Sequence, residues 1–425
     1  MEKYKVKRAE NFYAEINIPG SKSITNRALI LASLSEKDVV IKNPLFSDDT
    51  VYMIAALKKL GNDIEISQDK TQIKIRGNKT REFGNQKIFV GNAGTVMRFL
   101  VSYIASGKGT VVLEGNSRMN ERPIKELVES MRELGVSIEY LGEEGYPPIK
   151  INAEGIFKSS VKVSGKNSSQ YLSSILLSAS YFNNDVEIVI DDNIISKPYV
   201  TMTLKMIEQF GAHIETTSQG YKIYHKKYDK ISEYLVEGDM SSASYFLACA
   251  LMTNSTIKIN NFFAQSIQGD YKLLDILKNI GLKVIEQKEV SITVSGTEKY
   301  SGFNLRLNDT PDIVPTLAAT ALFAETPSEI RDVESLRVKE CDRISAVCTE
   351  IKKLNGNIIE YQDGFKIIPK SLNEYKGCDI ETYNDHRIAM SFTTAGLKIS
   401  NINILNPSCV SKTFPAFYDE IEKIY

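Results

Sequence analysis

Basic side chains occur where helices are expected to begin. A helix N-terminus carries partial positive charge and favours acidic or small polar residues, so a cation there costs about 0.3–1 kcal/mol. A bound anion reverses this sign, because the cation, the backbone N–H groups and the helix dipole then act together. One such residue is more simply a solvated surface side chain, but so many predict a binding site for a small polyanion. The residues are Lys22, Arg27, Arg98, Arg122, Lys197, Lys339, Arg343, His386, Arg387 and Lys412.

Two acidic residues among these cations could transfer protons. Asp312 follows Pro311, and Glu340 lies between Lys339 and Arg343. Carboxylates held among cations suit general acid–base catalysis, because neighbouring charges tune their protonation. Each residue also has a plainer interpretation: Asp312 could cap a helix, and Glu340 could pair with Arg343 within one.

Other common kinds of catalytic site are not indicated. The chain has no GxxxxGK[ST] motif, and the glycines of GNAGT (residues 91–95) do not fit the dinucleotide fingerprint. Without an HExxH motif or a Cys/His cluster, we expect neither a metal ion nor a cofactor. The five Cys residues form no CxxC pair, which favours free thiols in a reducing compartment.

A repeated pattern predicts the elements that position these residues. Five times a helical stretch ends in Gly before an alternating strand, at intervals of 70 to 76 residues. Each Gly is predicted to end its helix in the left-handed conformation. A second series, out of phase, consists of polar loops followed by helices of small apolar residues, which are expected to be buried on nearly all sides. The five glycines are Gly61, Gly135, Gly211, Gly281 and Gly356.

Six repeats of about 71 residues therefore predict an α/β fold. The segment from Lys87 to about Ala153 has the order βαβαββ, and right-handed crossovers bring the N-termini of its two helices to one side. Six units divide into two domains of three units each, around buried parallel helices. We expect one domain of residues 1–19 plus 238–425 and one of residues 20–237. The N-terminal KYKVKRA is expected to supply a strand to the last unit.

Composition excludes some partners. The 425 residues include 52 Lys and Arg against 53 Asp and Glu, for a net charge of −1. That balance argues against binding a nucleic acid, although it does not exclude a small polyanion. No apolar run approaches the roughly 18 residues that span a bilayer, and the N-terminus lacks the apolar region of a signal peptide. We therefore expect a cytoplasmic protein.

Ten ordered segments between residues 19 and 415 resemble the 5-enolpyruvylshikimate-3-phosphate (EPSP) synthase family. They are PGSKSITNRALILASL, GNAGTVMR, ERP, GKNSSQYLS, SKPYVTMTL, GDMSSASYF, DIVPTLA, RVKECDRI, NDHRIAM and SKTFP. The resemblance implies two domains, each an inside-out α/β barrel of three βαβαββ units, with both substrates bound between them. It implies a transferase that moves the enolpyruvyl group of phosphoenolpyruvate to the 5-hydroxyl of shikimate 3-phosphate through a tetrahedral intermediate. Phosphate is released, and the product leads to chorismate and the aromatic amino acids.

The resemblance also implies residue roles. Asp312 would be the base for the attacking hydroxyl, Glu340 the acid that protonates the methylene carbon, and Lys22 an aid to proton transfer. The shikimate 3-phosphate ligands would be Lys22, Ser23, Arg27, Ser168, Ser169, Gln170, Ser196, Tyr199, Asp312 and Lys339. The phosphoenolpyruvate ligands would be Lys22, Asn92, Gly94, Arg122, Gln170, Arg343, His386, Arg387 and Lys412. The family implies no metal ion or cofactor, a monomer, and a target of glyphosate.

Three positions depart from the family pattern. Phe99 follows Arg98 where relatives often have Pro, on the helix that carries Gly94, and so bears on the phosphoenolpyruvate pocket and on glyphosate sensitivity. Ser335 stands where relatives often have Asn, and we do not take it as a ligand. Cys341 replaces a frequent Thr, which we interpret as a neutral packing change.

Two other functions are less consistent with these residues. UDP-N-acetylglucosamine enolpyruvyl transferase has the same fold and the same phosphoenolpyruvate chemistry, but that family typically uses a Cys acid in the first half of the chain. Here no Cys precedes Cys249, so this alternative is disfavoured. An RNA-processing repeat protein of related fold would need a basic surface with aromatic stacking positions, or would lack the acid pair, and neither description fits.

Overall fold

The computed structural model describes residues 2–166, 168–191 and 194–425 and divides into two compact units. Gly20–Val236 form one unit, called here the continuous unit. The residues up to Pro19 and Glu237–Tyr425 form the other, called the split unit because two separate stretches of chain build it.

In its described residues, the continuous unit contains three four-stranded sheets of one topology. In each, a parallel pair is extended by two antiparallel strands, as where β6 pairs parallel with β7, and β7 and β8 both pair antiparallel with β9. This is the predicted βαβαββ unit. In sheet order, the strands are β14 (Glu233–Leu235), β3 (Val39–Lys42), β5 (Gln72–Arg76) and β4 (Asp63–Ile66); β6 (Glu82–Phe89), β7 (Lys108–Glu114), β9 (Ile149–Glu154) and β8 (Ser137–Tyr140); β10 (Ser160–Val163), β11 (Val186–Ile190), β13 (Gly220–Ile223) and β12 (Ile214–Thr216).

The split unit repeats this topology in two sheets and varies it in a third. In the third sheet β22 pairs parallel with β23, and the N-terminal β1 pairs antiparallel with β23, as predicted for KYKVKRA. The strands are β16 (Lys283–Lys288), β17 (Ser291–Ser295), β15 (Thr256–Asn260) and β2 (Tyr13–Asn17); β18 (Asn304–Arg306), β19 (Ser328–Arg331), β21 (Gly364–Ile368) and β20 (Asn357–Tyr361); β1 (Lys3–Lys5), β23 (Asn403–Leu405) and β22 (Asp379–Ile380).

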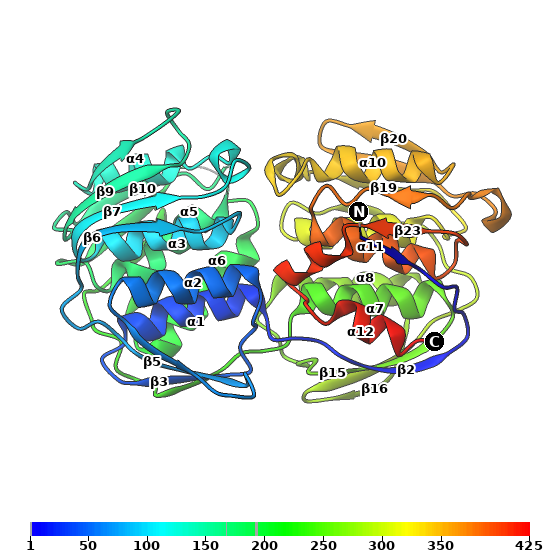
Figure 1. Ribbon diagram of the computed structural model, residues 1–425, viewed down its shortest axis with the longest axis horizontal. Helices are drawn as coiled ribbons and strands as arrows, with labels where there is room; N and C mark the ends of the chain where they lie inside the picture. Colours follow the sequence, from blue (N-terminus) through cyan, green and yellow to red (C-terminus); the bar gives the residue numbers. More distant parts are fainter. Residues whose placement is uncertain (1, 167, 192–193) are drawn as a thin grey trace. The chain divides into compact units, whose positions relative to one another are not determined.

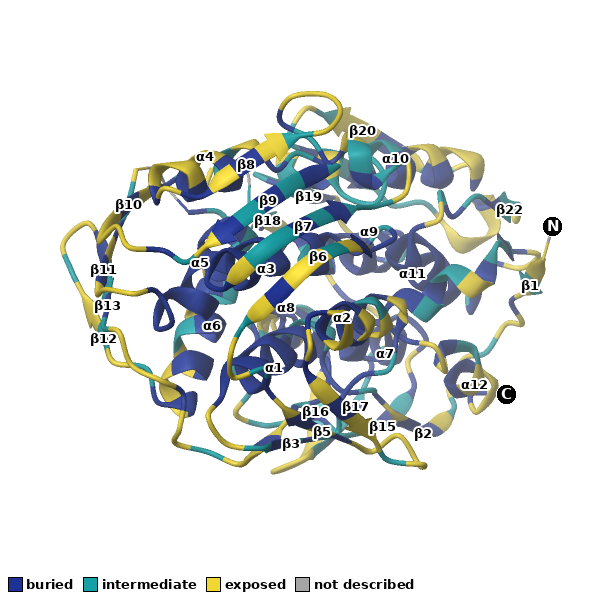
Figure 2. Cartoon of the chain, turned by 60° about the vertical axis from the view of Figure 1, so that its left-hand side comes forward, coloured by how far each residue is buried: buried dark blue, intermediate teal, exposed yellow. Residues whose placement is uncertain are grey.

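Helices fill the interior of each unit, and the sheets lie outside (Figure 1). In the continuous unit α1, α3 and α5 contact one another, and in the split unit α7, α9 and α11 do so. Every residue of α9 and α11 is buried, as expected for helices packed on nearly all sides (Figure 2). The helices are α1 (Lys22–Leu34), α2 (Asp48–Lys59), α3 (Gly94–Ala105), α4 (Lys125–Glu133), α5 (Ser169–Ala179), α6 (Lys197–Phe210), α7 (Met240–Met252), α8 (Lys272–Ile280), α9 (Val314–Ala321), α10 (Arg343–Lys353), α11 (His386–Gly396) and α12 (Phe417–Glu422), with short 3₁₀ helices η1 (Met119–Glu121), η2 (Gly269–Tyr271), η3 (Pro311–Ile313), η4 (Glu334–Val338), η5 (Leu372–Glu374) and η6 (Pro407–Lys412). Within the described ranges, none of them is long and apolar enough to cross a membrane.

Four of the five predicted glycines end their helices with a positive φ. They are Gly61 at 86°, Gly135 at 93°, Gly211 at 115° and Gly281 at 132°. The prediction is wrong for the fifth, because the positive φ of 61° belongs to Asn355. Asn tolerates this conformation, and the Asn355 amide donates to the Glu374 carbonyl at 2.9 Å. Gly356 instead allows close packing, since a Cβ there would lie 2.6 Å from Ile351 Cγ2.

Candidate active site

Arg343 gathers three carboxylates in the split unit. It is the first residue of α10, and its side chain is 2% exposed. Its Nη1 donates to Asp312 at 3.1 Å, its Nη2 to Glu340 at 2.8 Å and its Nε to Asp385 at 2.8 Å. Burial acts to lower the pKa of Arg343, but these carboxylates raise it above its ordinary value. One buried cation therefore fixes both acids that the sequence singled out.

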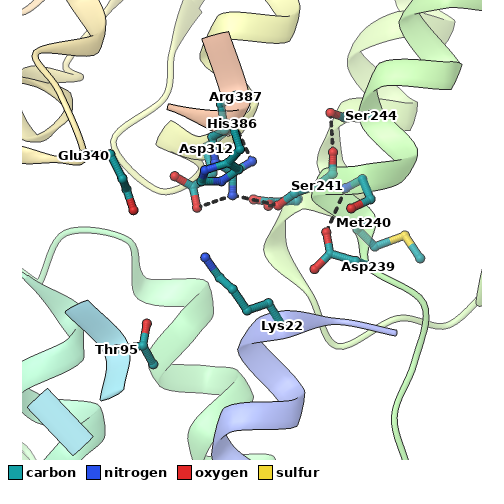
Figure 3. A network of polar contacts seen from close by, with 12 residues as sticks. Lys22, Thr95, Asp239, Met240, Ser241, Ser244, Asp312, Glu340, His386 and Arg387 are labelled. Carbon is teal, nitrogen blue, oxygen red and sulfur yellow. Dashed lines mark hydrogen bonds and ion pairs between the residues drawn. The ribbon is translucent and has the colours of Figure 1, made fainter. Parts of the chain in front are cut away.

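Asp312 does not cap a helix. It lies in η3, directly before α9, and neither helix start has a side-chain capping bond. One carboxylate oxygen accepts from Arg343, and the other accepts from Arg387 Nη2 at 2.8 Å (Figure 3). The side chain is 21% exposed. The capping interpretation is therefore wrong, and the carboxylate is held by two guanidinium groups.

Glu340 is nearly buried and contacts two cations. Its carboxylate accepts from Arg343 and lies 3.8 Å from Lys412 Nζ, and its side chain is 9% exposed. The pair with Arg343 spans a loop and the first helical residue, because Asp342 is the N-cap of α10. Lys339 is the C-cap of η4 and precedes the N-cap of α10, so the expectation that it stands at a helix start is wrong.

The N-terminus of α11 supplies Arg387 and His386. The N-cap Asp385 is fully buried and accepts from the Arg387 backbone N–H at 2.8 Å. The Arg387 side chain donates to both the carboxylate and the backbone carbonyl of Asp312. His386 is 1% exposed, and its Nδ1 lies 3.8 Å from Asp385. In the split unit the predicted cations Arg343, Arg387 and Lys412 therefore each contact at least one of the carboxylates of Asp312, Glu340 and Asp385.

Two guanidinium groups converge on Gly94 in the continuous unit. Gly94 begins α3, and a Cβ built there would lie 2.7 Å from both Arg122 Nη2 and Arg98 Nη1. Arg122 donates to the Asn92 carbonyl at 3.1 Å and to its side-chain oxygen at 3.2 Å. Arg98 donates to Gln170 Oε1 at 2.8 Å. A helix N-terminus flanked by two Arg side chains is suited to binding an anion.

The predicted shikimate-phosphate residues of the continuous unit lie at the starts of α1, α5 and α6. Ser23 follows the first residue of α1. Ser168 caps α5 and accepts from the Gln170 N–H at 3.2 Å, and Ser169 begins that helix. Ser196 caps α6 in a left-handed conformation, with φ 55° and ψ 43°, which costs a residue with a side chain about 1 kcal/mol.

Arg27 ties these helix starts together. It is 2% exposed, and its guanidinium donates to the carbonyls of Ser23 at 3.0 Å and of Tyr199 at 3.2 Å. The ring of Phe99 lies 5.0 Å from its guanidinium carbon, within the range of a cation–π contact. Burial lowers the pKa of Arg27 to about 10. Phe99, the residue that departs from the family pattern, therefore supports Arg27.

Lys22 begins α1 and contacts an acid from the neighbouring α2. Its Nζ lies 3.4 Å from Asp49 Oδ2, and the Asp49 side chain is 4% exposed. A buried carboxylate within ion-pair distance fixes the position of a cation more firmly than solvent would.

Comparison with known proteins decides the family. Residues 6–421 match the model of EPSP synthase (3-phosphoshikimate 1-carboxyvinyltransferase). The chain belongs to the EPSP synthase family. A 3-phosphoshikimate 1-carboxyvinyltransferase of Histophilus somni (strain 2336) is 42% identical over 431 residues. The alignment covers 100% of this chain and 99% of the relative's chain. A protein of the same name from Sulfurovum sp. (strain NBC37-1) is 40% identical over 418 residues, 96% of each chain.

A solved EPSP synthase from Acinetobacter baumannii has the same fold. Its TM-score is 0.81 at 23% identity, over 99% of this chain and 98% of its own. The predicted fold class, an inside-out α/β fold in two domains, is thus confirmed.

Three acids of this EPSP synthase family member were not predicted as site residues. Asp49 and Asp270 stand in the first turns of α2 and η2, where an acid is favoured, so their positions alone indicate no function. Asp385 lies directly before the predicted cations His386 and Arg387, and it contacts both Arg343 and Arg387. A signal in the sequence exists for Asp385 alone, because an acid that directly precedes two cations at an expected helix start is a candidate partner for them.

Proposed function

We infer that this EPSP synthase family member transfers the carboxyvinyl group of phosphoenolpyruvate to shikimate 3-phosphate and releases phosphate, a step on the route to chorismate. The family match over residues 6–421 carries this inference. Two relatives named for this activity, at 40% and 42% identity over nearly the whole chain, support it.

In the proposed mechanism two carboxylates of the split unit move protons. Asp312 accepts the proton of the 5-hydroxyl of shikimate 3-phosphate while the hydroxyl oxygen attacks C2 of phosphoenolpyruvate. Glu340 gives a proton to the methylene carbon C3. Glu340 then takes a proton back from C3 as the C2–O bond to phosphate breaks. This restores the double bond and yields the enolpyruvyl ether, and the proton held by Asp312 passes to the departing phosphate, which leaves as hydrogen phosphate. The shared contact with Arg343 supports the assignment, because it fixes both carboxylates against one rigid, buried group.

Phosphoenolpyruvate carries a phosphate and a carboxylate, and the proposed ligands present cations and helix N–H groups. Arg side chains offer planar, paired donors that match both anions. In the continuous unit, the convergence of Arg122 and Arg98 on Gly94 supports this assignment. The proposed ligands are Lys22, Asn92, Gly94, Arg122 and Gln170 of the continuous unit and Arg343, His386, Arg387 and Lys412 of the split unit.

Shikimate 3-phosphate presents hydroxyls, a carboxylate and a phosphate, and serines at helix starts can donate to the anionic groups. Arg27 also fixes Ser23 and Tyr199 through their carbonyls, so we assign it a positioning part as well as a ligand's. The proposed ligands are Lys22, Ser23, Arg27, Ser168, Ser169, Gln170, Ser196 and Tyr199 of the continuous unit, with Asp312 and Lys339 of the split unit.

We further propose that the protein acts in the cytoplasm as a monomer on these two small molecules. The five cysteines are free thiols, which supports a reducing compartment. Light scattering on the purified chain at several concentrations tests the monomer, since a mass that rises with concentration contradicts it.

Phosphate release from phosphoenolpyruvate tests the function, with each acceptor offered in turn. We expect release with shikimate 3-phosphate and none with UDP-N-acetylglucosamine. The reverse result would show the sister activity and overturn the proposal. Adding glyphosate to the productive reaction then measures the consequence of Phe99 for inhibitor binding.

A further inference from the structure

A partly buried serine and a buried acid stand behind the Arg387–Asp312 pair. Ser241 is the second residue of α7, and its hydroxyl donates to the Asp270 carboxylate. Arg387 Nη2 lies 3.4 Å from Ser241 Oγ and donates to Asp312 at 2.8 Å (Figure 3). Asp270 is 5% exposed. These four side chains form a continuous polar line within the split unit.

We propose that Asp270 and Ser241 are positioning residues for the transfer reaction, holding Arg387 so that it sets the orientation of Asp312. This proposal rests on the function proposed above. Neither residue has a role in the mechanism proposed above.

The direction of the hydrogen bonds carries the first step. A hydroxyl has one proton to donate, and the Ser241 proton goes to the carboxylate of Asp270. Its lone pairs are then left to face Arg387, which can only donate. Asp270 thus orients the hydroxyl, and the hydroxyl receives the guanidinium. Without Asp270 the hydroxyl could rotate and present its proton toward the cation.

The turn that carries Asp270 is braced against the start of α7. Gln268 accepts from the Met240 backbone N–H at 3.2 Å and donates to the Gly238 carbonyl at 2.8 Å. Gln268 is 7% exposed. These bonds fix η2 relative to α7, so the distance between Asp270 and Ser241 is set by backbone contacts as well as by their own hydrogen bond.

A capping role does not account for Asp270. Neither η2 nor α8 begins with a side-chain capping bond. Burial, and then the nearby Asp312, raise the pKa of Asp270 to about 7, while Arg387 and Ser241 act in the opposite direction and Asp239 adds to the rise. A carboxylate in such surroundings is costly unless it is paired. Its retention here is explained by its connection, through Ser241, to the guanidinium.

Steady-state kinetics of single variants test the proposal. Ser241→Ala removes the link, and we expect the KM for phosphoenolpyruvate to rise about tenfold, as for the loss of a hydrogen bond to a charged group. The kcat should also fall, because Asp312 is then held less firmly. Ser241→Thr keeps a hydroxyl and should restore both values. Asp275→Asn, an exposed acid on α8, is the matched control and should behave as the wild type.

The acid is tested by two variants with different expectations. Asp270→Asn can still accept from Ser241 and should change the pH profile of kcat/KM with a small effect at its optimum. Asp270→Ala should match Ser241→Ala, and the double variant should be no worse than either single one. Unchanged KM and kcat in Ser241→Ala, or additive losses in the double variant, would overturn the proposal.

A second measurement separates this proposal from the proposed function. The free energy of unfolding in urea is compared for Ser241→Ala, Asp270→Ala and their combination, without substrate. Coupled losses support the line of hydrogen bonds even if the wild type releases no phosphate from phosphoenolpyruvate, and additive losses refute it. If Asp270→Ala does not fold, Asp270→Leu, which also removes the acceptor and fills more of the space, replaces it in the same cycle. A wild type inactive with shikimate 3-phosphate refutes the proposed function instead.

Discussion

Replacing Gly94 by Ala should weaken phosphoenolpyruvate binding. The added Cβ would lie 2.7 Å from Arg122 Nη2 and from Arg98 Nη1, whereas ordinary contacts begin near 3.4 Å. The two guanidinium ends must therefore recede by about 0.7 Å. Neither can do so without cost, because Arg122 is bonded to Asn92 and Arg98 to Gln170.

The magnitude follows from those bonds. A hydrogen bond to a charged group contributes roughly 1.5–3 kcal/mol, and a misplacement near 1 Å can cost about a hundredfold in rate. We expect the KM for phosphoenolpyruvate to rise about 10- to 100-fold, with a smaller change in the KM for shikimate 3-phosphate. The fold should persist, because Ala is a better helix former than Gly and the displaced atoms are side-chain ends.

Phosphate release at varied phosphoenolpyruvate and saturating shikimate 3-phosphate measures this change. Gly142→Ala is the matched control, because Gly142 is exposed and the nearest atom to its Cβ is 3.6 Å away. A Gly94→Ala enzyme with an unchanged KM for phosphoenolpyruvate would refute the reasoning. So would an equal effect in Gly142→Ala.

Four further results are expected. Glu340→Gln should retain substrate binding in calorimetry but lower kcat by about a hundredfold or more, since the amide cannot donate the proton; an unchanged rate would remove Glu340 from that role. Asn355→Ala should lower the free energy of unfolding by about 1 kcal/mol, measured in urea, because Ala has a Cβ but no side-chain amide that stabilises a positive φ. Asn355→Gly should not lower it, because Gly has no Cβ and adopts a positive φ without strain. Asp270 binds its proton more tightly in the folded protein, with a pKa of about 7 against an ordinary 3.8, so the free energy of unfolding should fall as the pH rises through that window, and Asp270→Asn should flatten the fall. Dialysis against EDTA should leave phosphate release unchanged, and a loss restored by one divalent cation would show a metal requirement.

The architecture was largely predictable because it repeats. The residue that ends each of α2, α4, α6 and α8 must adopt the left-handed conformation. The glycines that meet this requirement, Gly61, Gly135, Gly211 and Gly281, therefore recur at the interval of the repeat. The fifth unit meets the same requirement with Asn355. The pattern could not show this, because a Gly stands at the next position for a different, steric reason. The error is local and leaves the topology of that sheet intact.

The sequence predicted the basic residues of the candidate site, because helix N-termini ordinarily favour acids over cations, but it did not predict the acids Asp49 and Asp270. A cation such as Arg343 at a helix start attracts attention because the helix dipole disfavours it. Asp49 and Asp270 attract none, because acids are common at helix starts. Their roles depend on side chains from neighbouring helices, Lys22 and Ser241, which sequence spacing alone cannot bring together.

The pairing of β1 with β23 also bears on the order of folding during synthesis. Lys3–Lys5 and Asn403–Leu405 form adjacent strands although about 400 residues separate them, so this sheet cannot close until nearly the whole chain has been translated. The continuous unit, whose strands all lie before Val236, can complete its sheets much earlier. The nascent N-terminal strands β1 and β2 must therefore wait, with unpaired edges, while a complete unit folds behind them. Charged residues in β1, Lys3 and Lys5, suit an edge that must avoid pairing with another chain during that wait.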